Sequence, residues 1–161
     1  MQYVSSQVRR HRLNQPGVRV LDLGGRDVNG TPRALFRRAA AYIAVDMRAG
    51  RGVDVVADAA TLDLGETFDV VLSTELLEHT DKGAQIVGTA RRHLRSAGTF
   101  LATMAGPGRL PHGASGEIRL PQGEYYANVE PEALEAWIRG AGFESWDINQ
   151  LGTDLRCRAI A

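Results

Sequence analysis

Two short apolar segments that each end in a carboxylate constrain this chain more than any other feature of its sequence. The first, VRVLDLGGRDVNG, begins at Val18 and places Asp22 just ahead of the adjacent glycines Gly24 and Gly25. The second, YIAVD, ends at Asp46 about twenty residues later. A buried strand, a glycine turn and a second buried strand are typical of the start of an open parallel sheet. Such sheets bind nucleotide-type cofactors beyond the carboxyl ends of their strands.

The rest of the chain alternates strand patterns with helical patterns. Strands are predicted at residues 19–23, 42–45, 53–57, 68–73 and 99–104. Helices are predicted at residues 4–13, 33–40, 76–79, 82–94 and 132–140. Two last strands, at 144–149 and 155–160, are joined by a connection too short for a helical crossover, so they must pair antiparallel. We therefore predict an α/β fold: a doubly wound, Rossmann-like, seven-stranded and mostly parallel sheet with a C-terminal antiparallel hairpin.

Local signals define how these elements begin and end. Thr31-Pro32 predicts the N-cap and first position of the helix at 33–40, and Ser96-Ala97-Gly98 predicts a helix stop. Residues 1–17 are expected to form an N-terminal helical segment. Residues 105–128 are rich in glycine and proline and lack periodicity, which predicts a loop on the substrate side of the sheet.

The composition favours one soluble domain over residues 1–161 and excludes several function classes. Apolar residues make up 43% of the chain, and the formal net charge is zero, so no overall field attracts nucleic acid or membrane. Cys157 is the single cysteine, which excludes an internal disulfide and leaves it as an inert apolar residue. The four histidines are scattered without metal-ligand spacing, so no metal is indicated. Without a signal-peptide pattern or a membrane-spanning run, we expect a cytoplasmic protein.

The glycine loop discriminates between cofactors. A dinucleotide fingerprint, G-x-G-x-x-G, would need glycine at positions 26 and 29, where the chain has Arg26 and Asn29. The carboxylate of Asp22 suits a cationic ligand better than an anionic diphosphate. S-adenosylmethionine carries a ribose, an adenine, an ammonium and a sulfonium, and no phosphate.

The chain resembles class I S-adenosylmethionine-dependent methyltransferases of the small type 11 kind. The resemblance covers roughly residues 18–143 and rests on VLDLGGRDVNG, YIAVD, ADA, FDVVLSTELLEHT and HLRSAGTFLATM. The family loop is D/E-x-G-x-G-x-G, so Gly24 matches its first glycine and Arg26 stands in place of its second.

The resemblance implies a set of cofactor contacts. The Asp22–Gly25 loop would hold the methionine part, Asp46 the ribose hydroxyls, and Asp58 with the Ala59 backbone the adenine. Ser73 to Glu75 would line the floor below the methyl group. The residues expected to bind S-adenosylmethionine are Asp22, Gly24, Gly25, Asp46, Met47, Asp58, Ala59, Ser73 and Glu75.

Methyl transfer needs alignment of the two partners and, for a hydroxyl, amine or acidic carbon, a base. The candidate bases are His79, His112, Glu75, Glu117 and the pair Tyr125-Tyr126. We favour His79, which follows the fourth strand near the predicted cofactor, and His112, in the substrate-side loop. His11 and His93 are assigned to solvated helix faces, although His11 lies among arginines that would suit an anionic partner.

The acceptor is expected to be a small molecule or a group on a precursor. The N/D-P-P-Y/F motif of amino-methylating DNA enzymes is absent, because that position reads STEL. Basic residues are not interleaved with aromatic ones, so nucleic acid is not indicated. Two alternatives remain: a non-catalytic S-adenosylmethionine-binding partner subunit, and a nucleotide-dependent oxidoreductase.

Overall fold

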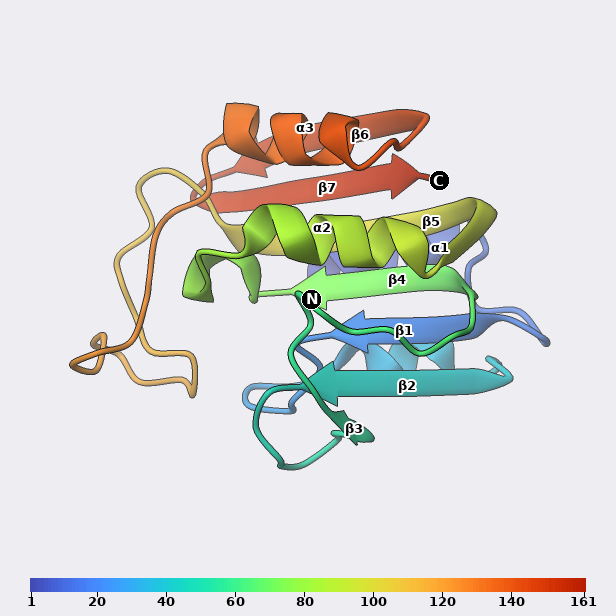
Figure 1. The fold of residues 1–161 in the computed structure, drawn as a ribbon, viewed down its shortest axis with the longest axis horizontal. Coiled ribbons are helices and arrows are strands. Elements are labelled where there is room, and N and C mark those ends of the chain that lie inside the picture. The colour runs from blue at the N-terminus through green and yellow to red at the C-terminus, as the bar shows by residue number, and fades with distance from the viewer.

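One seven-stranded sheet runs through the computed structural model, which describes residues 1–161 (Figure 1). Its strand order is β3-β2-β1-β4-β5-β7-β6. The strands are β1 (Arg19–Leu23), β2 (Ala41–Asp46), β3 (Val55–Val56), β4 (Phe68–Thr74), β5 (Leu94–Ala105), β6 (Ser145–Leu151) and β7 (Asp154–Ile160). β1 to β5 are parallel, and β7 runs antiparallel to both of its neighbours. The predicted sheet and its C-terminal hairpin are confirmed.

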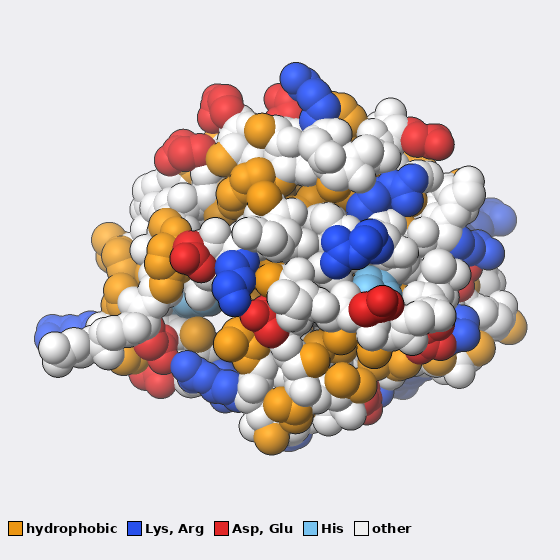
Figure 2. Space-filling model, in the orientation of Figure 1, with side chains coloured by type: hydrophobic (Ala, Val, Ile, Leu, Met, Phe, Trp, Pro, Cys, Tyr) orange, Lys and Arg blue, Asp and Glu red, His pale blue; other side chains and the backbone are white.

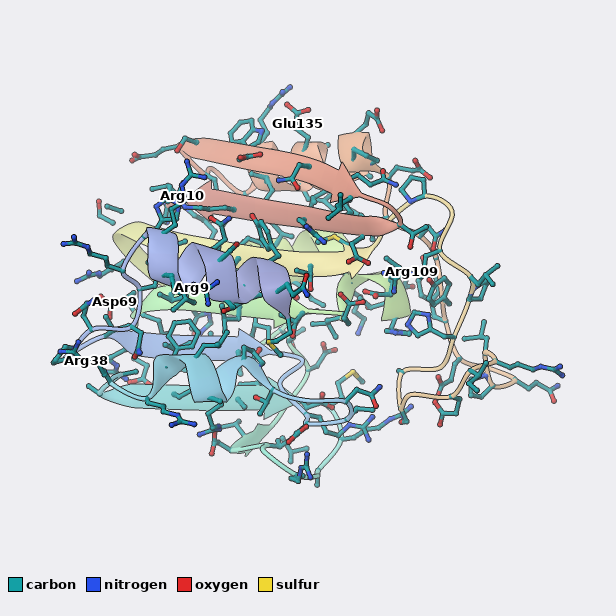
Figure 3. All side chains as sticks on the ribbon, turned by 180° about the vertical axis from the view of Figure 1, so that it is seen from behind. Arg9, Arg10, Arg38, Asp69, Arg109 and Glu135 are labelled. Carbon is teal, nitrogen blue, oxygen red and sulfur yellow. The ribbon has the colours of Figure 1, made fainter.

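Helices cover both faces of this sheet (Figures 1 and 3). On one face lie α2 (Gly83–Arg92) and α3 (Pro131–Gly140). On the other lie α1 (Gln2–Arg10) and η1 (Pro32–Phe36), a 3-10 helix. A second 3-10 helix, η2 (Leu77–His79), follows β4.

Successive side chains along each strand point to opposite faces of the sheet, so the apolar residues form two separate cores. Val20 faces the smaller core under α1, with Val4 and Val8, whereas Leu21 faces the larger core with Leu134 of α3. Side chains with a period of two therefore bury both sides of the sheet, as expected for parallel strands covered by helices. None of the helices combines the length and apolar character needed to cross a lipid bilayer.

The predicted helix at residues 33–40 is wrong in length and type. Thr31 caps it as expected, because its hydroxyl accepts a hydrogen bond from Arg33 N at 3.2 Å. However, the helix ends after one 3-10 segment, and Ala40 N donates to Val18 O at 2.7 Å. That bond draws the chain back to the start of β1, so β2 can begin beside it at Ala41. Tertiary pairing here overrides the helical pattern.

The predicted helix stop at Ser96-Ala97-Gly98 is also misplaced. α2 ends at Arg92, and β5 starts at Leu94, before those residues. Between Phe68–Leu94 and Val70–Thr99, the pairing of β4 with β5 contains an irregularity that absorbs the extra residues. Ala97 adopts a left-handed φ of 59° within it. The residues predicted to stop a helix therefore form a bulge within a strand.

His93 differs from its predicted place on a solvated helix face. It is buried, with Nε2 accepting a hydrogen bond from Leu64 N at 3.1 Å and Nδ1 2.9 Å from Thr89 O. Cys157 is likewise buried, in β7, where it packs in the larger core.

Candidate active site

A cleft of about 700 Å³ opens at the carboxyl ends of β1, β2, β4 and β5. β1 lies between β2 and β4, so the strand order reverses next to this cleft, where open α/β sheets bind their ligands. The 106–130 loop, which connects β5 to α3, forms the outer wall with residues 109, 112–114, 116 and 123–125. It contains no helix or strand, in agreement with the loop predicted there.

The structure brings nearly all of the predicted site residues to the wall of this one cleft. The wall includes Asp22, Gly24, Gly25, Asp46, Met47, Asp58, Ala59, Glu75, His79 and His112. Ser73 does not reach it: the side chain is fully buried, and Thr74 forms the neighbouring part of the wall.

The glycine loop lets the backbone border the cleft directly. Gly24 has a left-handed φ of +78°, and a Cβ there would lie 3.0 Å from Leu76 Cβ. A Cβ on Gly25 would lie 2.7 Å from Ala44 Cβ, which is closer than real Cβ atoms approach. Both amides donate to Val45 O, at 2.8 and 3.0 Å. Any side chain at Gly25 would therefore displace the loop or β2.

Asp22 presents an unsatisfied acceptor beside this loop. Its side chain is fully buried, and Oδ2 accepts a hydrogen bond from the Tyr42 hydroxyl at 2.6 Å. Oδ1 has no partner. Burial raises the pKa of Asp22 to about 7, against the hydrogen bond from Tyr42 and the charge of Arg33, which lower it. A cationic donor in the cleft would satisfy Oδ1 and offset this cost.

The carboxylates at the end of β2 and after β3 already accept hydrogen bonds. Asp46 Oδ1 accepts from Arg48 N at 2.9 Å. Asp58 accepts from Ala60 N at 2.9 Å and from Lys82 Nζ at 2.8 Å, and the Lys82 hydrogen bond in particular lowers the pKa of Asp58. Sequence reasoning missed Lys82, because only the fold brings the start of α2 next to the turn after β3.

Arg26 and Arg48 connect the side of the cleft formed after β1 and β2 to the 106–130 loop. Arg26 Nη2 donates to Ser115 Oγ at 2.8 Å, and Arg48 Nη1 donates to the same oxygen at 3.1 Å. Arg48 also pairs with Glu124 at 3.4 Å. We call these four residues, Arg26, Arg48, Ser115 and Glu124, the arginine clasp. The departure at Arg26 from the family's glycine therefore supplies a contact between two loops.

On the opposite side of the cleft, Glu75 projects from the end of β4. Its backbone has a left-handed φ of 52°, which is strained for a residue other than glycine. Oε1 accepts from Thr103 Oγ1 at 2.9 Å, and Oε2 lies 3.7 Å from Arg109. Arg109 is anchored by Thr153 and Asp154, and Figure 3 shows it beside this end of the sheet. Sequence reasoning missed Thr103 and Arg109, although Thr103 lies within the strand predicted at residues 99–104.

The two histidines predicted on the acceptor side come together in the fold. The rings of His79 and His112 lie 5.0 Å apart, and that of Tyr126 lies 5.5 and 5.0 Å from them. Burial, and then the neighbouring His112, lower the pKa of His79. Of the other candidate bases, Tyr125 lines the cleft, whereas Glu117 is exposed and bonded to Ser115 N at 3.0 Å.

Glu78 lies close to both histidines, with a carboxylate oxygen within 4.8 Å of a ring nitrogen of each. Its side chain is fully buried, and Oε1 accepts from Ala105 N at 3.1 Å. Burial, and then the nearby Glu75, raise the pKa of Glu78 to about 8. Glu78 was not among the predicted site residues, because a glutamate in a short helical segment is usually solvated.

The surface that carries α2 and α3 has no large patch of basic side chains (Figure 2). Figure 2 shows acidic and basic side chains interspersed over it. This agrees with a formal net charge of zero.

Comparison with known sequences identifies the family to which the chain belongs. Residues 21–102 match the family described as methyltransferase domain. The ubiquinone biosynthesis O-methyltransferase of Pseudomonas entomophila is 29% identical over 165 residues, which cover 85% of this chain and 69% of that protein.

Solved structures of similar fold cover almost the whole chain. One is the Burkholderia thailandensis 1,6-didemethyltoxoflavin-N1-methyltransferase, with bound 1,6-didemethyltoxoflavin and S-adenosylhomocysteine. It is 22% identical with a TM-score of 0.68, over 98% of this chain and 76% of that one. Another is the YcgJ protein of Bacillus subtilis, 12% identical with a TM-score of 0.76, over 99% and 98% of the two chains. At these identities the likeness concerns the fold.

Proposed function

The chain belongs to the methyltransferase domain family, and from this premise we propose that it transfers the methyl group of S-adenosylmethionine to a small molecule or to a group on a precursor. The observation that carries the proposal is the free oxygen of buried Asp22 beside a loop where backbone borders the cleft. That combination suits the cationic methionine part of S-adenosylmethionine. The negatively charged phosphates of a dinucleotide would instead face the Asp22 carboxylate, beside a loop that lacks the complete glycine motif.

We assign the cofactor to the half of the cleft formed after β1, β2 and β3. Gly24 and Gly25 let the methionine part approach the backbone. Asp46 accepts hydrogen bonds from the ribose hydroxyls, and Met47 packs beside it. At the far end, Asp58 and the backbone of Ala59 meet the adenine. Asp58 keeps its bond to Lys82, since each carboxylate oxygen can accept more than one hydrogen bond.

We assign the acceptor to the other half, between Glu75 and the 106–130 loop. His79 and His112 both face the cleft there and are the groups that handle the acceptor's proton. Tyr126 packs against both rings and fixes their orientation.

The reaction is an in-line displacement at the methyl carbon. A lone pair of the acceptor attacks that carbon, and the carbon–sulfur bond breaks with its electron pair going to sulfur. S-adenosylhomocysteine leaves as a neutral thioether, so the protein contributes mainly alignment. The acceptor loses its proton to a base or to solvent.

Calorimetric titration tests the cofactor assignment. We expect saturable binding of S-adenosylmethionine and no comparable binding of NAD. Asp22→Asn should weaken S-adenosylmethionine binding at least about tenfold, or about 1.4 kcal/mol, because a charge-assisted hydrogen bond is lost. Asp63→Asn, an exposed turn residue outside the cleft, is the matched control. Tight NAD binding without a response to S-adenosylmethionine would overturn the proposal.

Transfer of a labelled methyl group, screened over metabolite pools, tests catalysis and identifies the acceptor. We expect label to enter a small molecule or a precursor. Tight cofactor binding with no labelled product in any pool would instead support the non-catalytic partner subunit.

A further inference from the structure

Three side chains on the acceptor side form a donor set for a metal ion. Glu78, His79 and His112 each offer one ligand atom, and these atoms all lie within 4.8 Å of one another. We propose that they bind a divalent zinc-type cation and that this ion receives the acceptor's oxygen. The proposal deepens the proposed function, on which its catalytic part rests.

The free atoms of all three side chains are consistent with coordination. Glu78 uses Oε1 to accept from Ala105 N, while the buried Oε2 has no partner. His79 Nδ1 is also buried without a partner. His112 Nδ1 lies 3.2 Å from Leu110 O, so a proton on Nδ1 leaves Nε2 as the nitrogen with a free lone pair. Metal-binding histidines are commonly oriented by a hydrogen bond of this kind.

Surrounding charges favour a cation at this point. The carboxylates of Glu124, Glu75 and Glu117 act to raise the pKa of His79. The nearby Arg109 is turned toward Glu75 and Asp154. Glu75 pairs with Arg109 and Glu124 with Arg48, which leaves the buried Glu78 without a basic partner. A buried carboxylate of this kind is costly alone and is stabilised by a divalent ion.

The type of donor limits which ion fits. Two imidazole nitrogens and one carboxylate oxygen match catalytic zinc sites, which keep another position open for water or substrate. Neighbouring ligands of a tetrahedral zinc ion lie about 3.4 Å apart. The three ligand atoms lie within 4.8 Å of one another, so any wider spacing has to close by side-chain rotation when the ion binds. Since His112 is on a loop, it can make this adjustment without moving the sheet.

The open position gives the ion a chemical role. With their lone pairs on the ion, His79 and His112 would act on the acceptor's proton through the metal and not as bases themselves. A hydroxyl bound to zinc loses its proton to solvent more readily, as zinc-bound water does. The oxygen then attacks the methyl carbon, the carbon–sulfur bond breaks toward sulfur, and the products are a methyl ether and S-adenosylhomocysteine. This predicts an oxygen acceptor.

Titration of the chelator-treated full chain with Zn²⁺ alone tests the site by calorimetry. We expect one ion per chain with a Kd below about 1 μM. His112→Ala should weaken binding at least about 100-fold, and Glu78→Gln, of nearly equal volume, should do so without a change in fold. His11→Ala removes a histidine outside the cleft and should bind like the parent protein. In the visible spectrum, Co²⁺ should give intense tetrahedral bands that His112→Ala abolishes.

The same samples separate this proposal from the function on which it rests. No saturable Zn²⁺ binding, or unchanged binding in His112→Ala, would overturn the metal site, even where chelator-treated protein still binds S-adenosylmethionine and transfers methyl groups. Zn²⁺ binding that depends on His112, in a protein that does not bind S-adenosylmethionine, would support the metal site while the proposed function fails.

Discussion

The two halves of the cleft are built by different means. The cofactor half comes from consecutive strand ends between Asp22 and Ala59 and relies on backbone shape and short polar side chains. The acceptor half draws on segments far apart in the chain, from Glu75 to Tyr126, and is held by long side chains such as Arg109. The arginine clasp joins them through contacts that span up to 89 positions. One half is therefore a property of local sequence, and the other of tertiary contacts.

The largest expected effect comes from filling the backbone space of the cofactor half. Gly25→Ala would place a Cβ 2.7 Å from Ala44 Cβ. We expect S-adenosylmethionine binding to weaken at least about 100-fold, or about 2.7 kcal/mol, by calorimetry. Gly140→Ala, where no atom lies within 4 Å of the added Cβ, is the control for an added methyl group. Thermal unfolding of both variants separates a local effect from loss of fold. Normal cofactor affinity in Gly25→Ala would show that backbone approach does not define this half.

A smaller effect is expected from a single polar contact in the same half. Asp46→Ala should weaken S-adenosylmethionine binding about tenfold, or about 1.4 kcal/mol, because the bonds to the ribose hydroxyls are lost. Asp63→Ala provides the matched removal of an aspartate outside the cleft. Equal affinities for the Asp46 variant and the parent would refute the assignment of the ribose to the end of β2.

The buried carboxylate makes the cofactor half sensitive to pH. Because the pKa of Asp22 is about 7 in the folded protein, compared with an ordinary 3.8, the folded state binds this proton more tightly than the unfolded state. Its contribution to stability therefore falls as the pH rises from about 4 to about 7. A cationic ligand prefers the ionised form, so S-adenosylmethionine affinity should rise about threefold between pH 6.5 and 7.5. Calorimetry at these pH values should show no such rise in Asp22→Asn; an equal rise there would assign the effect to another group.

The smallest expected effect on cofactor affinity concerns the connection between the halves. Arg26→Gly restores the family's glycine and removes the clasp's 2.8 Å hydrogen bond to Ser115. We expect amide hydrogen exchange in residues 113–116 to quicken about three- to tenfold, as loss of one hydrogen bond implies. Cofactor affinity should change by less than about twofold. Arg119→Gly, an exposed residue of the same loop, is the control. Unchanged exchange would mean that the loop is held without Arg26.

The elements predicted correctly from the sequence are those with strong local patterns. Short apolar runs predicted β1 at its exact bounds and β4 to within one residue, because strands buried on both faces are apolar along almost their whole length. The short connection at Gly152 fixed the antiparallel pair β6 and β7. The helix predicted at 33–40 was wrong, because pairing of Ala40 with Val18 outweighed local propensity.

The sequence alone determined the class of fold and which residues line the half of the cleft assigned to the cofactor, since both depend on motifs that are local in the chain. Only the tertiary structure decided what faces that half. It packed His79 against His112, placed Glu78 close to both, and carried Arg26 to Ser115. These contacts cross from strand ends to a loop with no periodic pattern, and their geometry exists only after the sheet has set the distance between them.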